Sequence, residues 1–216
     1  MTQLFTPRSS RLLRVSLLAL PLLVSLGFGS LYLYVRSDAA WNVGVAADQP
    51  IAFRHDLHAG DLGLDCRYCH ASVENAASAG MPSAQTCMTC HSQVWTGLAP
   101  LEPLRTSVAF DAPIEWTSVH KLPAHAFFHH GIHVAKGVAC QTCHGRVDRM
   151  TQTVKTETLS MGWCLDCHRN PGTRLSEPEQ VFSMTEAGTA ALSSQQLMAL
   201  HDITVDNLTD CSTCHR

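Results

Sequence analysis

The clearest hydrophobic pattern in the chain is a run of 21 residues without a charge, Val15 to Val35 (VSLLALPLLVSLGFGSLYLYV). A helix rises about 1.5 Å per residue, so this run spans roughly 31 Å and matches the hydrocarbon core of a bilayer. Pro21 is compatible with such a helix because neighbouring helices can satisfy the carbonyl that proline leaves unpaired. The pattern predicts a transmembrane helix at 15–35 after a leader at 1–14.

The rest of the chain has little periodicity. Residues 98–123 (LAPLEPLRTSVAFDAPIEWTSVHKLP) are rich in proline, which predicts an extended crossing segment with a short strand-like stretch at 114–119. Residues 193–200 (SSQQLMAL) have the pattern of a short helix capped by Ser193 or Ser194. We therefore expect a mainly α fold with much irregular structure.

The charge distribution indicates how the chain is oriented. Three arginines precede the apolar run, Arg8, Arg11 and Arg14. The positive-inside rule then places the N-terminus in the cytoplasm and residues 37–216 on the extracytoplasmic side of the inner membrane. A cleaved signal peptide is the alternative because Asp38-Ala39-Ala40 resembles a cleavage site, although signal cores usually have only about 7 to 15 apolar residues.

Composition limits what the exported part can be. Residues 37–216 carry 11 lysines and arginines against 18 aspartates and glutamates, a formal charge of −7, so nucleic acid is not an expected partner. Only 6% of the chain is aromatic, whereas it contains 10 cysteines and 13 histidines. Few large side chains are available to fill a core, which predicts that something other than side chains fills it.

The cysteines carry the strongest chemical signal. All ten fall into five copies of C-x-x-C-H: Cys66/Cys69/His70, Cys87/Cys90/His91, Cys140/Cys143/His144, Cys164/Cys167/His168 and Cys211/Cys214/His215. This is the attachment motif of c-type haem, in which two thiols bond covalently to the porphyrin and the histidine ligates iron. Five disulfides would leave the recurring histidines unexplained, and the cysteine–histidine spacing is too short for the usual zinc sites. We expect five covalently bound haems.

The spacing of the motifs reveals an internal repeat. Their first cysteines are 21, 53, 24 and 47 residues apart, which predicts two two-haem modules and a final single site. Each module opens with F-x-H-x-x-H, at Phe53–His58 and at Phe128–His133. The predicted divisions are a linker at 36–52, a module at 53–97, the crossing segment at 98–127, a module at 128–175 and a C-terminal segment at 176–216.

The repeat also suggests the second axial ligands. Histidines three residues apart on a helix share a face and can serve two different haems. F-x-H-x-x-H before C-x-x-C-H resembles class III multihaem cytochromes c, which implies His55 for the first haem, His130 for the third, and His58 and His133 for others. We expect His120 to be the fifth distal ligand. Met150 or Met161 is the alternative for one haem, because a thioether can also ligate haem iron.

Six-coordinate irons transfer electrons but offer no open position for a substrate. A multihaem reductase usually marks its open iron by lysine in place of the motif histidine, and the chain has no C-x-x-C-K. We therefore expect no catalytic residues in the chain itself.

Longer stretches resemble one family more closely, the pentahaem cytochrome c subunit of alternative complex III. These stretches are FRHDLHAGDLGLDCRYCH at 53–70, IEWTSVHKLP at 114–123, 128–145, LSMGWCLDCHR at 159–169 and LTDCSTCHR at 208–216. The resemblance implies electron relay from quinol-binding membrane subunits and an iron–sulfur, molybdopterin-like subunit to a monohaem cytochrome c or a terminal oxidase. The alternatives are a self-sufficient membrane-anchored quinol dehydrogenase and a periplasmic multihaem reductase with an open iron.

Overall fold

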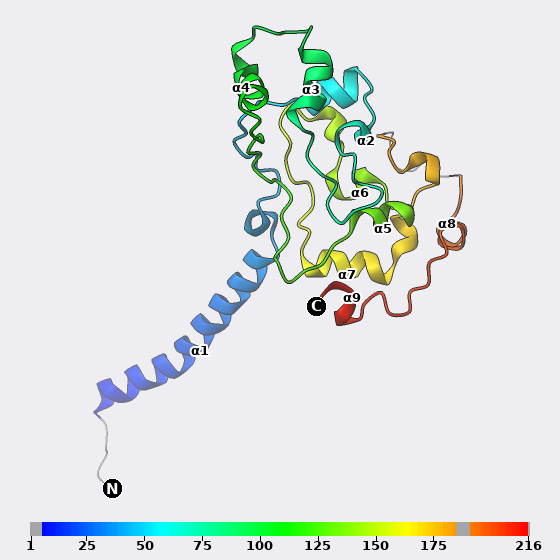
Figure 1. Cartoon of the computed structure of the whole chain (residues 1–216). Helices are drawn as coiled ribbons and strands as arrows, with labels where there is room; N and C mark the ends of the chain where they lie inside the picture. Colours follow the sequence, from blue (N-terminus) through cyan, green and yellow to red (C-terminus); the bar gives the residue numbers. More distant parts are fainter. Residues whose placement is uncertain (1–5, 185–190, 216) are drawn as a thin grey trace. The chain divides into compact units, whose positions relative to one another are not determined.

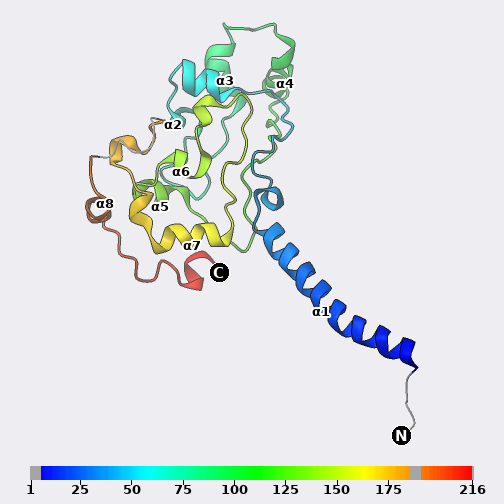
Figure 2. The ribbon, with the colours of Figure 1, turned by 180° about the vertical axis from the view of Figure 1, so that it is seen from behind.

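The structure, a computed structural model, describes residues 6–184 and 191–215 (Figures 1 and 2). It divides into two compact units, residues 1–42 and residues 43–216. The first contains the long apolar helix and the second all of the C-x-x-C-H motifs.

The N-terminal unit is built on helix α1, Pro7–Val35. The Thr6 side chain caps its first turn by accepting a hydrogen bond from the backbone nitrogen of Ser9, and Pro7 stands where helices tolerate proline best. None of its side chains is buried, and by length and composition the helix can cross a membrane. The helix predicted at 15–35 is thus confirmed, although it starts within the predicted leader.

The second unit consists of short helices joined by irregular segments, which confirms the predicted fold class. Its α-helices are α2 Cys66–Cys69, α3 Ala84–His91, α4 Glu102–Phe110, α5 His130–Ala135, α6 Cys140–His144, α7 Met161–Arg169, α8 Ser194–Leu200 and α9 Cys211–Cys214. A π-helical turn, Asp56–Asp61, carries His58 of the first F-x-H-x-x-H segment, and His55 is its N-cap. In the described residues β-structure is limited to isolated bridges, such as Val43 with Lys155.

The prediction for 98–123 is wrong in two respects. Glu102–Phe110 forms helix α4, because Pro103 lies in its first turn, where its missing N–H costs nothing, and Leu104 supplies a buried face. Residues 114–119 form no strand; instead the Gln49 side chain bonds both backbone groups of Thr117, at 2.7 and 2.9 Å. A side chain thus satisfies the backbone groups that a strand partner would otherwise bond.

Helix α8 confirms the helix predicted near residue 195. Ser193 is its cap and forms a reciprocal capping box with Gln196. Leu197 is the buried residue of this helix.

Apolar side chains form only a small core. Among the described residues, the buried hydrophobic positions are Ile51, Val73, Ala84, Leu104, Ala139, Leu175, Val181 and Leu197. The one cluster they form joins α3 to α4 through Ile51, Ala84 and Leu104. The helices that carry the other motifs therefore have little side-chain packing to hold them together.

Helix α5 is fixed instead by backbone contacts with the loop after α2. The backbone nitrogens of His130 and Gly131 donate to the carbonyls of Ala77 and Ala76, at 3.2 and 3.1 Å. A Cβ atom at Gly131 would lie 2.6 Å from the carbonyl oxygen of Glu74, so only glycine allows this approach. The contact joins the second F-x-H-x-x-H region to the loop that follows the first attachment motif. Helices α5 and α6 lie centrally in this unit (Figure 1).

Candidate haem-binding centre

Each C-x-x-C-H motif forms a helical turn. Helices α2, α6 and α9 start at the first cysteine of their motif. Helix α3 ends at the histidine of its motif, and α7 ends one residue after the histidine of its motif. Side-chain caps place the turns: Asp65 accepts from the backbone nitrogen of Arg67, Ser83 from Thr86 and Ser160 from Trp163. Residues three apart share a helix face, so each turn presents two thiols side by side. All ten cysteines lie in the described residues as free thiols, and no disulfide joins them.

The structure places the ring of a second histidine near four of the five attachment histidines. The ring centroids lie 6.2 Å apart for His58 and His91, 6.3 Å for His130 and His144, 6.2 Å for His133 and His168, and 5.7 Å for His125 and His215. His55 lies close enough to His70 for their charges to interact. Each F-x-H-x-x-H segment thus places its two histidines beside the histidines of two different motifs.

These distances suit a metal ion between the rings. A metal–imidazole bond is about 2.0 Å, so two nitrogens on opposite sides of one metal lie about 4 Å apart and the centres of their rings about 6 Å apart.

Hydrogen bonds fix which ring nitrogen faces each partner. Nδ1 of His70, His91, His168 and His215 bonds the carbonyl oxygens of Gly80, Val94, Leu208 and His125, at 2.8, 3.1, 2.7 and 2.9 Å. Nδ1 of the opposite histidines His58, His130 and His133 bonds the carbonyls of Arg54, Ala77 and His129, and that of His55 bonds the Thr153 hydroxyl. Engaging Nδ1 leaves Nε2 for a metal and sets the tautomer, as is usual for ligating histidines.

Burial keeps several of these rings neutral. It lowers the pKa of His144 to about 3, with a smaller effect of the His120 charge, and it lowers the pKa of His55 to about 4, helped by His70. Burial also lowers the pKa of His133. Only a neutral imidazole has a lone pair for iron, so this electrostatic environment favours ligation.

The attachment sites adjoin one another in a single order. The Tyr68 hydroxyl in the first motif bonds the Thr89 hydroxyl in the second at 2.7 Å. The Cys66 and Cys140 thiols are within hydrogen-bonding reach, which lowers the pKa of Cys66 to about 7 and raises that of Cys140.

Helix α5 joins the third and fourth sites. His168 bonds the carbonyl of Leu208 in the last segment, and Cys164 lies near Cys214. The sites therefore follow the order second, first, third, fourth and fifth.

Comparison with known proteins decides the family. Residues 51–99 and 126–216, more than half of the chain, match the family model described as cytochrome c7 and related cytochrome c. The chain belongs to this family of cytochromes c. It is also similar to the multiheme cytochrome c subunit of menaquinone reductase from Nitratidesulfovibrio vulgaris (strain Hildenborough), with 35% identity over 99 residues. The aligned region covers 45% of this chain and 46% of that relative, so the chain spans about half the length of the relative it matches.

Two orphaned polar atoms support covalent haem in this cytochrome. Among the described residues, the Trp116 indole nitrogen and the Thr156 hydroxyl are buried without a hydrogen-bond partner. Trp116 packs on the same apolar cluster as Cys87, and Thr156 lies against Gly145, the residue after His144. Buried polar groups normally have partners, so both positions fit a further group with polar atoms beside the second and third motifs.

The structure places His125, and not His120, beside the fifth attachment histidine. His120, the residue expected from sequence, does not face His215; its Nε2 lies 3.3 Å from Nδ1 of His144. Nε2 of His120 is thus engaged with the ring of His144. His125 faces His215 instead, brought there by a bond from the backbone nitrogen of Phe127 to the carbonyl of Cys214 at 2.7 Å.

The methionine alternative gains no support from this arrangement. Four attachment histidines have another histidine ring within about 6 Å, and the fifth, His70, interacts with His55. Met161 is 62% exposed at the start of α7, and the backbone carbonyl of Met150 accepts a bond from Asp56.

Two further histidines have other structural roles. His129 caps α5 by accepting a bond from the backbone nitrogen of Ile132. Nε2 of His201 bonds the carbonyl of Ser176 at 2.7 Å.

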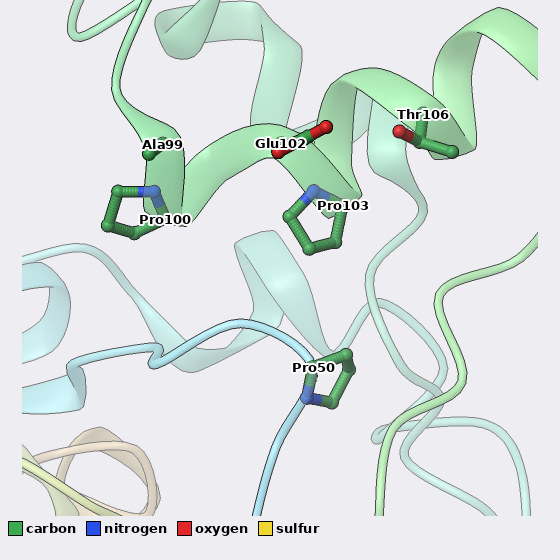
Figure 3. A pocket seen from close by; sticks show the side chains of 6 residues that line it. All are labelled: Pro50, Ala99, Pro100, Glu102, Pro103 and Thr106. Carbon is green, nitrogen blue, oxygen red and sulfur yellow. The ribbon is translucent and has the colours of Figure 1, made fainter.

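A hollow elsewhere on this unit offers no comparable chemistry (Figure 3). It lies between Pro50 and the start of α4, where Pro100 and Pro103 line it with Glu102 as the one charged side chain. No attachment cysteine or histidine reaches it.

Proposed function

We propose that this chain is a pentahaem electron-carrying subunit of a membrane quinone oxidoreductase. Each pair of motif thiols would hold one haem, with ligands from the motif histidine and from His55, His58, His130, His133 or His125. A c-type haem with two histidine ligands supplies reversible one-electron chemistry without a free coordination position. On this basis residues 53–97 and 128–175 are two-site modules and residues 176–216 carry the last site.

The observation that carries this proposal is the uninterrupted order of the sites. The π turn at Asp56–Asp61 and helix α5 each lie between two sites, and the Cys66–Cys140 contact joins the modules. An enzyme needs only one reactive site and a substrate cavity, whereas an electron carrier needs neighbouring sites along its length. The exposed cysteines are Cys90 and Cys211, one at each end of the row. These ends are where partners would exchange electrons.

The quinone link rests on two similarities. The chain resembles the pentahaem subunit of alternative complex III, which implies quinol oxidation in partner subunits. The relative from Nitratidesulfovibrio vulgaris is a subunit of a menaquinone reductase, which favours the opposite direction of electron flow. We propose quinol oxidation towards a monohaem cytochrome c or a terminal oxidase, with menaquinone reduction as the second candidate.

The first experiment counts and characterises the haems. Pyridine haemochrome analysis and mass spectrometry of the purified chain should give five c-type haems per chain, all low-spin in the ferric state. Fewer haems would contradict the proposed sites. A high-spin ferric signal that responds to nitrite or hydroxylamine would favour a reductase.

The second experiment identifies the partners and the direction. Mild detergent purification of the native protein should recover membrane subunits and an iron–sulfur subunit with it. That complex should reduce cytochrome c with menaquinol faster than it reduces menaquinone with a low-potential donor such as reduced methyl viologen. Recovery as a lone chain that oxidises menaquinol by itself would support a self-sufficient dehydrogenase.

Helix α1 would anchor the chain with its N-terminus in the cytoplasm. Deletion of residues 1–36, with an unrelated cleavable signal in their place, should release the haem unit into the soluble periplasmic fraction. Protease added to spheroplasts should cleave the full-length haem unit from outside. Protection of that unit in intact spheroplasts would contradict this orientation.

A further inference from the structure

His144 differs from the other attachment histidines in the partner of its Nδ1 atom. Nδ1 of the other four bonds a backbone carbonyl oxygen. Nδ1 of His144 instead faces a side chain, His120, whose Nε2 lies 3.3 Å away. The two rings meet edge to face, with centroids 4.3 Å apart and planes at 73°.

The direction of this hydrogen bond follows from the ligand role of His144. A neutral histidine that binds iron through Nε2 carries its proton on Nδ1. His144 must therefore donate, and Nε2 of His120 must accept with its single lone pair. His120 is thereby fixed as the tautomer with its proton on Nδ1.

The surroundings hold His120 in this position. Its backbone carbonyl accepts a bond from the Ser118 hydroxyl at 2.9 Å, and both imidazoles are partly buried. His144 also lies near His130, whose ring is nearly parallel at 11° with the centroids 6.3 Å apart. His120 contacts His144 at Nδ1, the ring nitrogen that a ligand bound through Nε2 leaves free.

We propose that His120 is a positioning residue that strengthens His144 as an axial ligand and lowers the reduction potential of the haem at the third site. This inference rests on the proposed pentahaem function. An imidazole nitrogen is a better acceptor than an amide oxygen, and a hydrogen bond to the distant nitrogen of a ligating histidine raises its basicity. A more basic ligand stabilises ferric over ferrous iron.

Three variants of the full-length, haem-loaded chain test this role. His120→Phe keeps a planar ring but removes the acceptor, and His120→Leu is a second non-accepting variant in case phenylalanine does not fit. His120→Asn keeps an acceptor oxygen. Haem content by pyridine haemochrome verifies that each variant has assembled.

Equilibrium redox titration provides the readout. In the phenylalanine or leucine variant, we expect one of the five components to move to a more positive potential. The expected size is a tenfold change in that haem's ferric-to-ferrous ratio, about 59 mV for one electron. The other four components should keep their potentials. In the asparagine variant, the potential of the third haem should stay close to the wild-type value.

The possible results separate the inference from the function. An unchanged titration in a fully loaded phenylalanine or leucine variant would overturn the role of His120, as would equal shifts in these variants and in asparagine. A high-spin ferric signal in them would show that His120 ligates iron itself. A wild-type chain without haem on Cys140 and Cys143 would instead refute the proposed function.

Discussion

His125 holds His215 in two ways at once. The two rings lie 5.7 Å apart at 27°, and the backbone carbonyl of His125 accepts the Nδ1 hydrogen of His215 at 2.9 Å. These residues are 90 positions apart in the chain. One residue therefore both orients the last attachment histidine and presents the ring that faces it.

Substitution of His125 should open the last haem. We expect His125→Ala to produce a high-spin ferric signal equivalent to one haem of five, because the iron loses its sixth ligand. Electron paramagnetic resonance of the oxidised chain measures this directly. His129→Asn is the matched control, since asparagine retains the helix cap and should leave all haems low-spin. An entirely low-spin His125→Ala spectrum would contradict this ligand.

The two histidines of α5 should act on different haems. His130 faces His144, and His133 faces His168. His130→Ala and His133→Ala should each convert one haem to high spin, and the double variant should convert two. Spin quantification checks the sum, and a double variant with only one high-spin haem would mean that both histidines serve a single site.

Ring orientation should distinguish two haems in the native spectrum. The ligand rings of the third site are nearly parallel at 11°, whereas His58 and His91 are inclined at 51°. Parallel imidazoles donate into the same iron d orbital and split the d levels more, so the third haem should give the more rhombic low-spin signal. His130→Ala should remove that signal and His58→Ala the more axial one. Loss of the opposite signals would contradict the ring geometry.

The attachment residues could be predicted from sequence because covalent attachment needs cysteines and histidine within one helical turn. His58 and His133 were also predictable, since the repeat carries them next to His55 and His130. The sequence could not show whether His120 or His125 lies beside His215, because this depends on how segments 90 positions apart come together in the fold. The helix at Glu102–Phe110 could not be recognised for another reason. A proline-rich stretch usually indicates extended chain, but here the proline lies in the first turn, where it permits a helix.

The small apolar cluster should have a measurable effect on stability. Leu104 is 2% exposed and packs with Ile51 and Ala84, so Leu104→Ala should lower the free energy of unfolding by about 2–5 kcal/mol. Val108 on the same helix is 37% exposed, and Val108→Ala should cost less than about 1 kcal/mol. Urea unfolding of the haem-loaded chain, followed by circular dichroism, compares them. Equal losses would show that the cluster does not support the fold.

The backbone contacts of α5 with residues 74–77 have a consequence for maturation. Helix α5 places one histidine beside the motif histidine at each of two sites while it rests on the loop that follows the first attachment motif. If these histidines ligate haem, a site left empty during biogenesis would leave its neighbour with a poorly held ligand. Partially loaded molecules should then be degraded by proteases, so that mature chains accumulate with their full complement of cofactors or not at all.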